Sequence, residues 1–145
     1  MCMTEAVVFD LDDTLLRNDR TISDFTVDVM RSLAGHGIRI LPASGRARES
    51  MEGFVRQLNC CDTFIACNGA EIWNTDGNCL YASVLPPDVA QDIIAFGKKY
   101  HVYMHTYDGP YFYYNVESHW SREYASATLL TGRWKPDLEQ FLPAI

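Results

Sequence analysis

Short apolar runs alternate with amphipathic stretches of helical spacing through the first half of the chain. Strands are expected at 6–9, 38–41 and 63–67, with a helix capped by Ser23 and ended by Gly35 or Gly37, and a second helix at roughly 47–58. Strand–helix–strand units of this kind form a parallel sheet covered by helices, and such sheets bind ligands at the carboxyl ends of their strands. The first half is therefore predicted to be an α/β fold.

The pattern changes beyond Asn68-Gly69. We expect a hairpin around Asp76-Gly77, a helix opened by Pro86-Pro87, aromatic strands at 101–107 and 111–116, and helices at 120–129 and 136–142. These elements are typical of an antiparallel α+β module. The sequence therefore predicts a Rossmann-like parallel core sheet in residues 1–72, with an inserted α+β cap module in residues 73–145.

Composition narrows the partners and the compartment. The chain has 145 residues, 48% of them hydrophobic, and its 12 Lys+Arg against 19 Asp+Glu give a formal charge of −7. No broad basic surface is available, so neither nucleic acid nor an anionic membrane is an expected partner. The sequence contains neither an apolar run of the ~18–20 residues that span a membrane nor a signal-peptide pattern at its start. A soluble, cytoplasmic protein is expected.

Cysteine and histidine give little sign of a metal or redox site. The five cysteines show no Cys-x-x-Cys spacing, and Cys60-Cys61 is expected to pack as an ordinary pair of reduced thiols. His101 and His105 would share one face of a strand. A third ligand of suitable type is lacking nearby, so metal binding by these histidines is not expected.

The most informative segment is Phe9-Asp10-Leu11-Asp12-Asp13-Thr14, in which a predicted buried strand leads directly into three acids. Clustered carboxylates repel one another and are costly to desolvate unless a cation or protons compensate them. Hard oxygen ligands favour Mg²⁺. The alternative is that the acids merely cap the loop or the following helix.

Three segments together resemble one family. Asp10-Leu11-Asp12-Asp13-Thr14, Leu41-Pro42-Ala43-Ser44-Gly45-Arg46 and Cys67-Asn68-Gly69-Ala70 each follow a predicted strand. They resemble the motifs of the haloacid dehalogenase (HAD) superfamily, whose members are mostly phosphatases, and in particular its Cof-like subfamily with an α/β cap. The resemblance covers essentially the whole chain and is strongest in residues 5–72.

The resemblance implies roles for the first segment. Asp10 would be the nucleophile that forms an aspartyl-phosphate, and Asp12 the general acid and then the general base. Mg²⁺ would be held by the Asp10 carboxylate and the Asp12 backbone carbonyl. Thr14 would help to fix the loop.

The other two segments would bind phosphate and substrate. Ser44 and the Gly45 N–H would donate hydrogen bonds to the phosphoryl oxygens, and Arg46 and Asn68 would line the site. Two alternatives remain open at this point. Ser44-Gly45 could be a plain helix N-cap and turn, and Arg46 could be a solvated first-turn residue.

Two further parts of the family pattern are not found: a lysine after a later strand, and a Gly-Asp-x-x-x-Asp-like motif that completes the Mg²⁺ shell. Lys98, Lys99 and Lys135 lack the required context, and Asp88-x-x-x-Asp92 is interpreted as an acidic first helical turn. We interpret the chain as a truncated form, a proteolytic product or an incomplete gene product. Self-association through an incomplete core is expected.

The leading hypothesis is a Mg²⁺-dependent phosphatase acting on a small phosphorylated metabolite, such as a sugar phosphate or nucleotide, with impaired activity in this chain. The alternatives are a phosphomutase-type transferase and a non-catalytic phosphate-binding or self-association module. Ten of the 18 aromatic residues lie between Phe96 and Tyr124. They could form the core of the cap, or some of them could select the leaving group.

Overall fold

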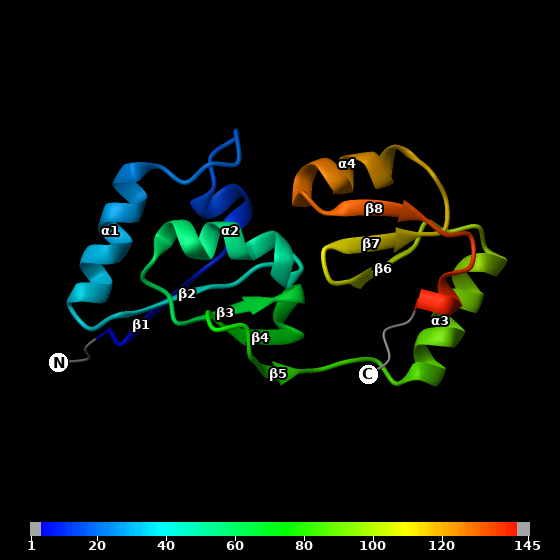
Figure 1. The fold of residues 1–145 in the computed structure, drawn as a ribbon, viewed down its shortest axis with the longest axis horizontal. Helices are drawn as coiled ribbons and strands as arrows, with labels where there is room; N and C mark the ends of the chain where they lie inside the picture. The colour runs from blue at the N-terminus through cyan, green and yellow to red at the C-terminus, as the bar shows by residue number, and fades with distance from the viewer. Residues whose placement is uncertain (1–3, 142–145) are drawn as a thin grey trace. The chain divides into compact units, whose positions relative to one another are not determined.

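The structure is a computed structural model, and it describes residues 4–141 (Figure 1). Its contacts separate two compact units, Met1–Ser83 and Val84–Ile145. The first unit contains β1 (Ala6–Phe9), η1 (Leu11–Leu15), α1 (Asp24–Gly35), β2 (Arg39–Pro42), α2 (Arg48–Leu58), β3 (Thr63–Ala66), η2 (Cys67–Gly69), β4 (Glu71–Asn74) and β5 (Cys79–Ala82). The predicted strand–helix alternation is thus present in the first unit.

The parallel core of the first unit runs β1–β2–β3. Strands β1 and β2 pair in parallel, with Ala6 opposite Arg39, and a parallel bridge from Ala43 to Ile65 joins the end of β2 to β3. Strands β4 and β5 extend β3 as an antiparallel hairpin. The α/β fold class is confirmed. Because the hairpin pairs with β3, the two compact units divide after Ser83, later in the chain than the predicted boundary at 72/73.

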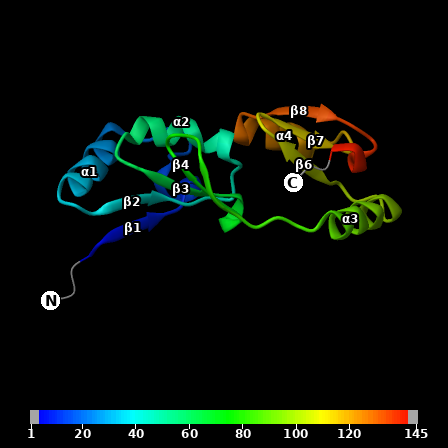
Figure 2. The same cartoon turned by 60° about the horizontal axis from the view of Figure 1, so that its bottom comes forward.

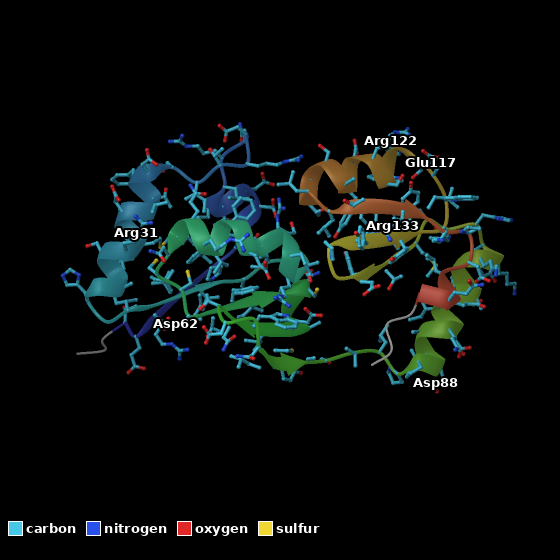
Figure 3. All side chains as sticks on the ribbon, viewed as in Figure 1. Arg31, Asp62, Asp88, Glu117, Arg122 and Arg133 are labelled. Atoms are coloured by element: carbon cyan, nitrogen blue, oxygen red, sulfur yellow. The ribbon has the colours of Figure 1, made fainter. Side chains whose placement is uncertain are left out.

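Both helices of the first unit lie on the same side of its sheet (Figures 1 and 2). The buried core beneath them includes Ile40, Met51, Leu58 and Phe64, each exposed by 2% or less. Arg31 of α1 donates from Nε and Nη2 to the carbonyls of Leu58 and Gln57 at the end of α2 (Figure 3). These bonds satisfy carbonyls that the helix leaves unpaired, so they fix one helix on the other.

The end of α2 leads into the cysteine pair. Cys60 and Cys61 are both free thiols, and Cys61 is 7% exposed. Burial raises the pKa of the Cys61 thiol to about 12. A thiol held in its neutral form packs as a small apolar group, as the sequence predicts.

The second unit contains α3 (Pro87–Lys99), β6 (His105–Asp108), β7 (Tyr111–Tyr114), α4 (His119–Thr128), β8 (Thr131–Trp134) and η3 (Leu138–Phe141). Its sheet has the order β6-β7-β8, antiparallel between β6 and β7 and parallel between β7 and β8. The expectation of a purely antiparallel module is therefore wrong. The helix predicted at 136–142 is the short turn η3, and Leu142 lies outside the described residues.

One sequence expectation for β6 also changes. His101 has a left-handed φ of 55° in the turn after α3, so it does not share a strand with His105. Instead His105 packs against Tyr124 of α4, with ring centroids 4.5 Å apart. The hydroxyls of Tyr107 and Tyr124 are hydrogen-bonded at 2.6 Å. These three aromatic groups hold α4 on the sheet.

Between residues 4 and 141, no helix has both the length and the apolar character needed to cross a membrane.

Candidate functional site

The carboxyl ends of the three parallel strands surround one cavity of about 340 Å³. Its lining includes four of the predicted site residues, Asp10, Ser44, Gly45 and Asn68, together with Ala43, Ile65 and Gly69. Three separate segments of the chain thus converge because parallel strands end at the same edge of a sheet. This convergence is the geometry expected of an active site in an α/β fold.

Asp10 is held at the start of a single wide turn. Its Oδ1 accepts a hydrogen bond of 2.8 Å from the backbone N–H of Leu11, and the turn closes where the Leu16 N–H donates to the Leu11 carbonyl at 2.8 Å. Leu11 is fully buried and anchors the turn in the core. Asp13 takes a left-handed φ of 55°, which lets the backbone reverse immediately after Asp12. The Asp10 carboxylate is therefore fixed at the end of β1.

The loops after β2 and β3 are joined by backbone hydrogen bonds. The Ser44 N–H donates to the Ile65 carbonyl at 3.0 Å, and the Asn68 N–H donates to the Ser44 carbonyl at 3.1 Å. Ser44 is 7% exposed, and its Oγ accepts from the Arg46 N–H at 3.3 Å. The hydroxyl proton is then left as a donor. The plain N-cap interpretation of Ser44 is wrong, because the N-cap of α2 is Ala47.

Gly45 provides the close approach between the two loops. A Cβ at this position would lie 2.9 Å from Oδ1 and 3.3 Å from Nδ2 of Asn68. The Asn68 side chain therefore crosses directly over the Gly45 backbone. Asn68 itself has a left-handed φ of 55°, a conformation that asparagine adopts more readily than most residues.

Asp12 and Arg46 form an ion pair beside this cavity. Arg46 donates from Nε to Asp12 Oδ2 and from Nη2 to Asp12 Oδ1, both at 2.8 Å, and from Nη1 to Ser50 Oγ at 2.8 Å. These hydrogen bonds lower the pKa of the Asp12 carboxyl below its ordinary value of 3.8. The Arg46 side chain is only 6% exposed, so the solvated alternative for Arg46 is wrong.

Two residues at this ion pair were not anticipated from the sequence. Ser50 is 8% exposed and bonds to Arg46, and the Phe54 ring lies 5.4 Å from the Arg46 guanidinium carbon. The available signal was the spacing of 50 and 54, which places these two side chains on one face of α2, close after Arg46 in the chain.

The remaining predicted residues lie elsewhere. Thr14 is exposed on η1, and its role in fixing the loop stays a prediction. Lys98 belongs to α3 in the second unit, where its Nζ lies 3.6 Å from Asp137 Oδ1. Asp88 lies in the first turn of α3, as predicted (Figure 3).

The oxygen donors at the strand end suit Mg²⁺ in kind. One carboxylate, from Asp10, and the Asp12 carbonyl are hard ligands of the type that Mg²⁺ prefers. Both oxygens of the Asp12 carboxylate are engaged by Arg46. Within residues 4–141 no group of three or more His, Cys, Asp or Glu side chains could hold a metal. The described residues thus offer two oxygen donors of a kind that suits Mg²⁺, the Asp10 carboxylate and the Asp12 carbonyl.

Comparison with known proteins gives consistent matches. The model of the haloacid dehalogenase-like hydrolase family matches residues 7–141. The HMP-PP phosphatase of Yersinia pestis is 29% identical over 92 residues, which cover 63% of this chain and 34% of that protein. A solved haloacid dehalogenase-like hydrolase from Bacteroides thetaiotaomicron superposes with a TM-score of 0.87 at 23% identity, covering 99% of this chain and 56% of that one.

The HAD subclass IIB sugar phosphatase BT4131 superposes with a TM-score of 0.75 at 20% identity, over 90% of this chain and 53% of that one. The chain spans about a third of the length of the curated relatives it matches. The share is 33% for a putative phosphatase of Haemophilus influenzae and 34% for the Yersinia pestis protein. The likeness to these two solved structures establishes the fold, and the family model covers nearly all of the sequence. The chain belongs to the haloacid dehalogenase-like hydrolase family.

Proposed function

We propose that the chain carries the nucleophile and phosphate-binding half of a phosphatase that hydrolyses a small phosphorylated metabolite. The observation that carries this proposal is the single cavity shared by Asp10, Ser44, Gly45 and Asn68 at the strand ends. A carboxylate opposite hydroxyl and backbone N–H donors suits attack on phosphorus, because the donors can hold the phosphoryl oxygens while the carboxylate approaches.

The proposed chemistry has two displacements. An Asp10 carboxylate oxygen attacks phosphorus, and the bond from phosphorus to the leaving oxygen breaks. Asp12 gives a proton to that oxygen, and for this it must first take up a proton from solvent and release one of its two hydrogen bonds from Arg46. Water then attacks the aspartyl-phosphate, Asp12 takes a proton from the water, and the bond from phosphorus to Asp10 breaks to release inorganic phosphate. Ser44 donates to the phosphoryl oxygens in both steps.

We further propose that Mg²⁺ is held by the Asp10 carboxylate and the Asp12 carbonyl. A bound Mg²⁺ would offset negative charge on the carboxylate and the phosphoryl group. The first unit is proposed as the catalytic core and the second as the cap that selects the substrate. The names of the relatives support a phosphorylated metabolite in general, one as an HMP-PP phosphatase and one as a sugar phosphatase.

Phosphate release from an aryl phosphate and a panel of sugar phosphates tests the proposal. Asp10→Asn is expected to lower turnover by roughly 1,000-fold or more, because the amide cannot form the covalent intermediate. Asp13→Asn is the matched control, since Asp13 is exposed in the same turn and asparagine tolerates its left-handed φ. A phosphoryl adduct on the Asp10 peptide should be found by mass spectrometry after acid quenching.

Turnover that survives Asp10→Asn would contradict the proposed nucleophile. Binding of inorganic phosphate without any turnover, in the unsubstituted chain, would favour the non-catalytic phosphate-binding module instead.

A further inference from the structure

The ion pair between Arg46 and Asp12 is unequal in burial. The Arg46 side chain is 6% exposed, whereas that of Asp12 is 49% exposed. Burying a guanidinium is costly, and an ion pair with a half-exposed carboxylate returns little stability. Stability alone therefore does not account for a buried arginine at this position.

The hydrogen bonds between Arg46 and Asp12 fix the orientation of the Asp12 carboxylate, which a simple charge attraction would not do. The Arg46 fork donates to both oxygens of Asp12 at 2.8 Å, which fixes the plane of the carboxylate as well as its position. Arg46 is fixed in turn by its third hydrogen bond, to Ser50 Oγ, and by the Phe54 ring. Arg46 does not line the cavity that Asp10 and Ser44 share.

We propose that Arg46 and Ser50 are positioning residues for Asp12, and that Arg46 is not a ligand of the phosphoryl group. Ser50 acts on Arg46, and Arg46 holds the Asp12 carboxylate plane beside the cavity. This inference rests on the proposed function for its catalytic consequence, but the arrangement of the three side chains is testable without any turnover. It also replaces the substrate-binding role that the sequence suggested for Arg46.

The chemical consequence concerns charge as well as position. Asp10 and Asp12 lie two residues apart in the chain. The Arg46 guanidinium pairs with the negative charge of Asp12 and does not pair with that of Asp10. The two carboxylates are therefore different before any substrate binds, with Asp10 facing the cavity and Asp12 held to one side. Part of the positive charge that the acid cluster needs comes from Arg46.

Nuclear magnetic resonance of arginine side chains tests the arrangement directly. The Arg46 Nη protons should give separate, slowly exchanging signals, because the fork and Ser50 together block rotation of the guanidinium. Asp12→Ala should collapse these signals, and Ser50→Ala should speed the rotation. Ser32→Ala is the matched control, because Ser32 is an exposed serine in α1. Arg46 signals that neither Asp12→Ala nor Ser50→Ala alters would overturn the proposal.

Kinetics separates positioning from binding if the chain turns over. Arg46→Met is expected to lower kcat on the order of 100-fold, and Ser50→Ala on the order of tenfold, both with KM little changed, because a misplaced catalytic group slows the reaction without weakening binding. Arg56→Met is the control, since Arg56 is an exposed arginine on α2, the helix that carries Ser50. A rise in KM with kcat unchanged in Arg46→Met would mean that Arg46 binds the phosphoryl group, which overturns the proposal.

The two proposals fail in different ways. Loss of the proposed function shows as an Asp10→Asn variant that still releases phosphate. Loss of the positioning proposal shows in the Arg46 resonances, whether or not phosphate is released.

Discussion

Asp10 and Asp12 look equivalent in the sequence, yet the structure gives them different partners. Asp10 accepts from the neighbouring Leu11 N–H, a local bond that follows from its place at the end of a strand. Asp12 is bound by Arg46, which is 34 residues away in the chain. Local pattern predicts the first kind of contact. The second depends on where the loop after β2 meets the loop after β1, and sequence spacing does not reveal that meeting.

Gly45→Ala should weaken phosphate binding while leaving stability nearly unchanged. The new Cβ would lie 2.9 Å from Asn68 Oδ1, so the Asn68 side chain must move. A side-chain end moves cheaply, so the free energy of unfolding should change by less than about 1 kcal/mol. The displaced amide lies at the cavity, so binding of inorganic phosphate should weaken on the order of tenfold, or ~1.4 kcal/mol, measured by calorimetry.

The control tests whether the loss of binding comes from displacement of Asn68. It compares Asn68→Ala with the double variant that carries both Gly45→Ala and Asn68→Ala. If displacement of Asn68 causes the loss, the double variant should bind phosphate like Asn68→Ala alone. Additive losses would mean that Gly45 acts through its own backbone N–H instead.

At the scale of elements, strands with apolar or aromatic runs, such as β1 and β7, were predicted correctly. Strand β8 escaped prediction because Thr131-Gly132-Arg133-Trp134 shows no apolar alternation. It forms because the Tyr111–Tyr114 strand offers an edge and because Gly132 allows close contact with aromatic rings. The predicted strand at 101–107 begins late, at His105, since the chain first reverses through the left-handed His101.

Gly132→Ala should destabilise the second unit. A Cβ on Gly132 would lie 2.6 Å from Cζ of Phe112, a fully buried ring, and 3.1 Å from a carbon of the Tyr114 ring. Rigid rings cannot yield as a flexible side chain can, so the expected loss is roughly 1–3 kcal/mol. Urea unfolding followed by near-ultraviolet circular dichroism measures it, because tyrosines are concentrated in this unit.

The matched control carries the opposite sign. Gly53 lies in the exposed face of α2 with open space around its Cβ position, so Gly53→Ala should stabilise the first unit by about 0.5–1 kcal/mol. A Gly132→Ala variant as stable as the parent would show that the sheet can shift to admit a methyl group.

On the scale of the whole molecule, the order of strands and helices in the first unit followed from the sequence, and the exposure of its first strand did not. Ala6–Phe9 was expected to be buried, but Val8 is 58% exposed. Within residues 4–141, β1 pairs with β2 alone, so one edge of the strand has no neighbour. A strand is buried when it has a neighbouring strand on each side, and the apolar run 6–9 does not by itself provide the second neighbouring strand.

That edge is the reason to expect self-association of this chain. The carbonyls of Glu5 and Phe9 accept hydrogen bonds from the β2 segment. Backbone groups of successive residues in a strand point to opposite sides, so the N–H and C=O of Val8 point to the open edge. Val8→Pro removes that N–H without removing a β1–β2 bond, and it should shift the chain toward monomer in light scattering. Phe25→Ser is the control, since Phe25 is 77% exposed and belongs to α1, outside the β1 strand.

Salt should change the association in a defined direction. The formal charge of −7 opposes contact between copies, and added salt screens that repulsion, with a Debye length of about 10 Å at 0.1 M. The associated fraction should therefore rise with salt in the parent chain and in Phe25→Ser, and remain low in Val8→Pro. If Phe25→Ser abolished association while Val8→Pro did not, copies would meet through an exposed helix face and the open strand edge would have no part in it.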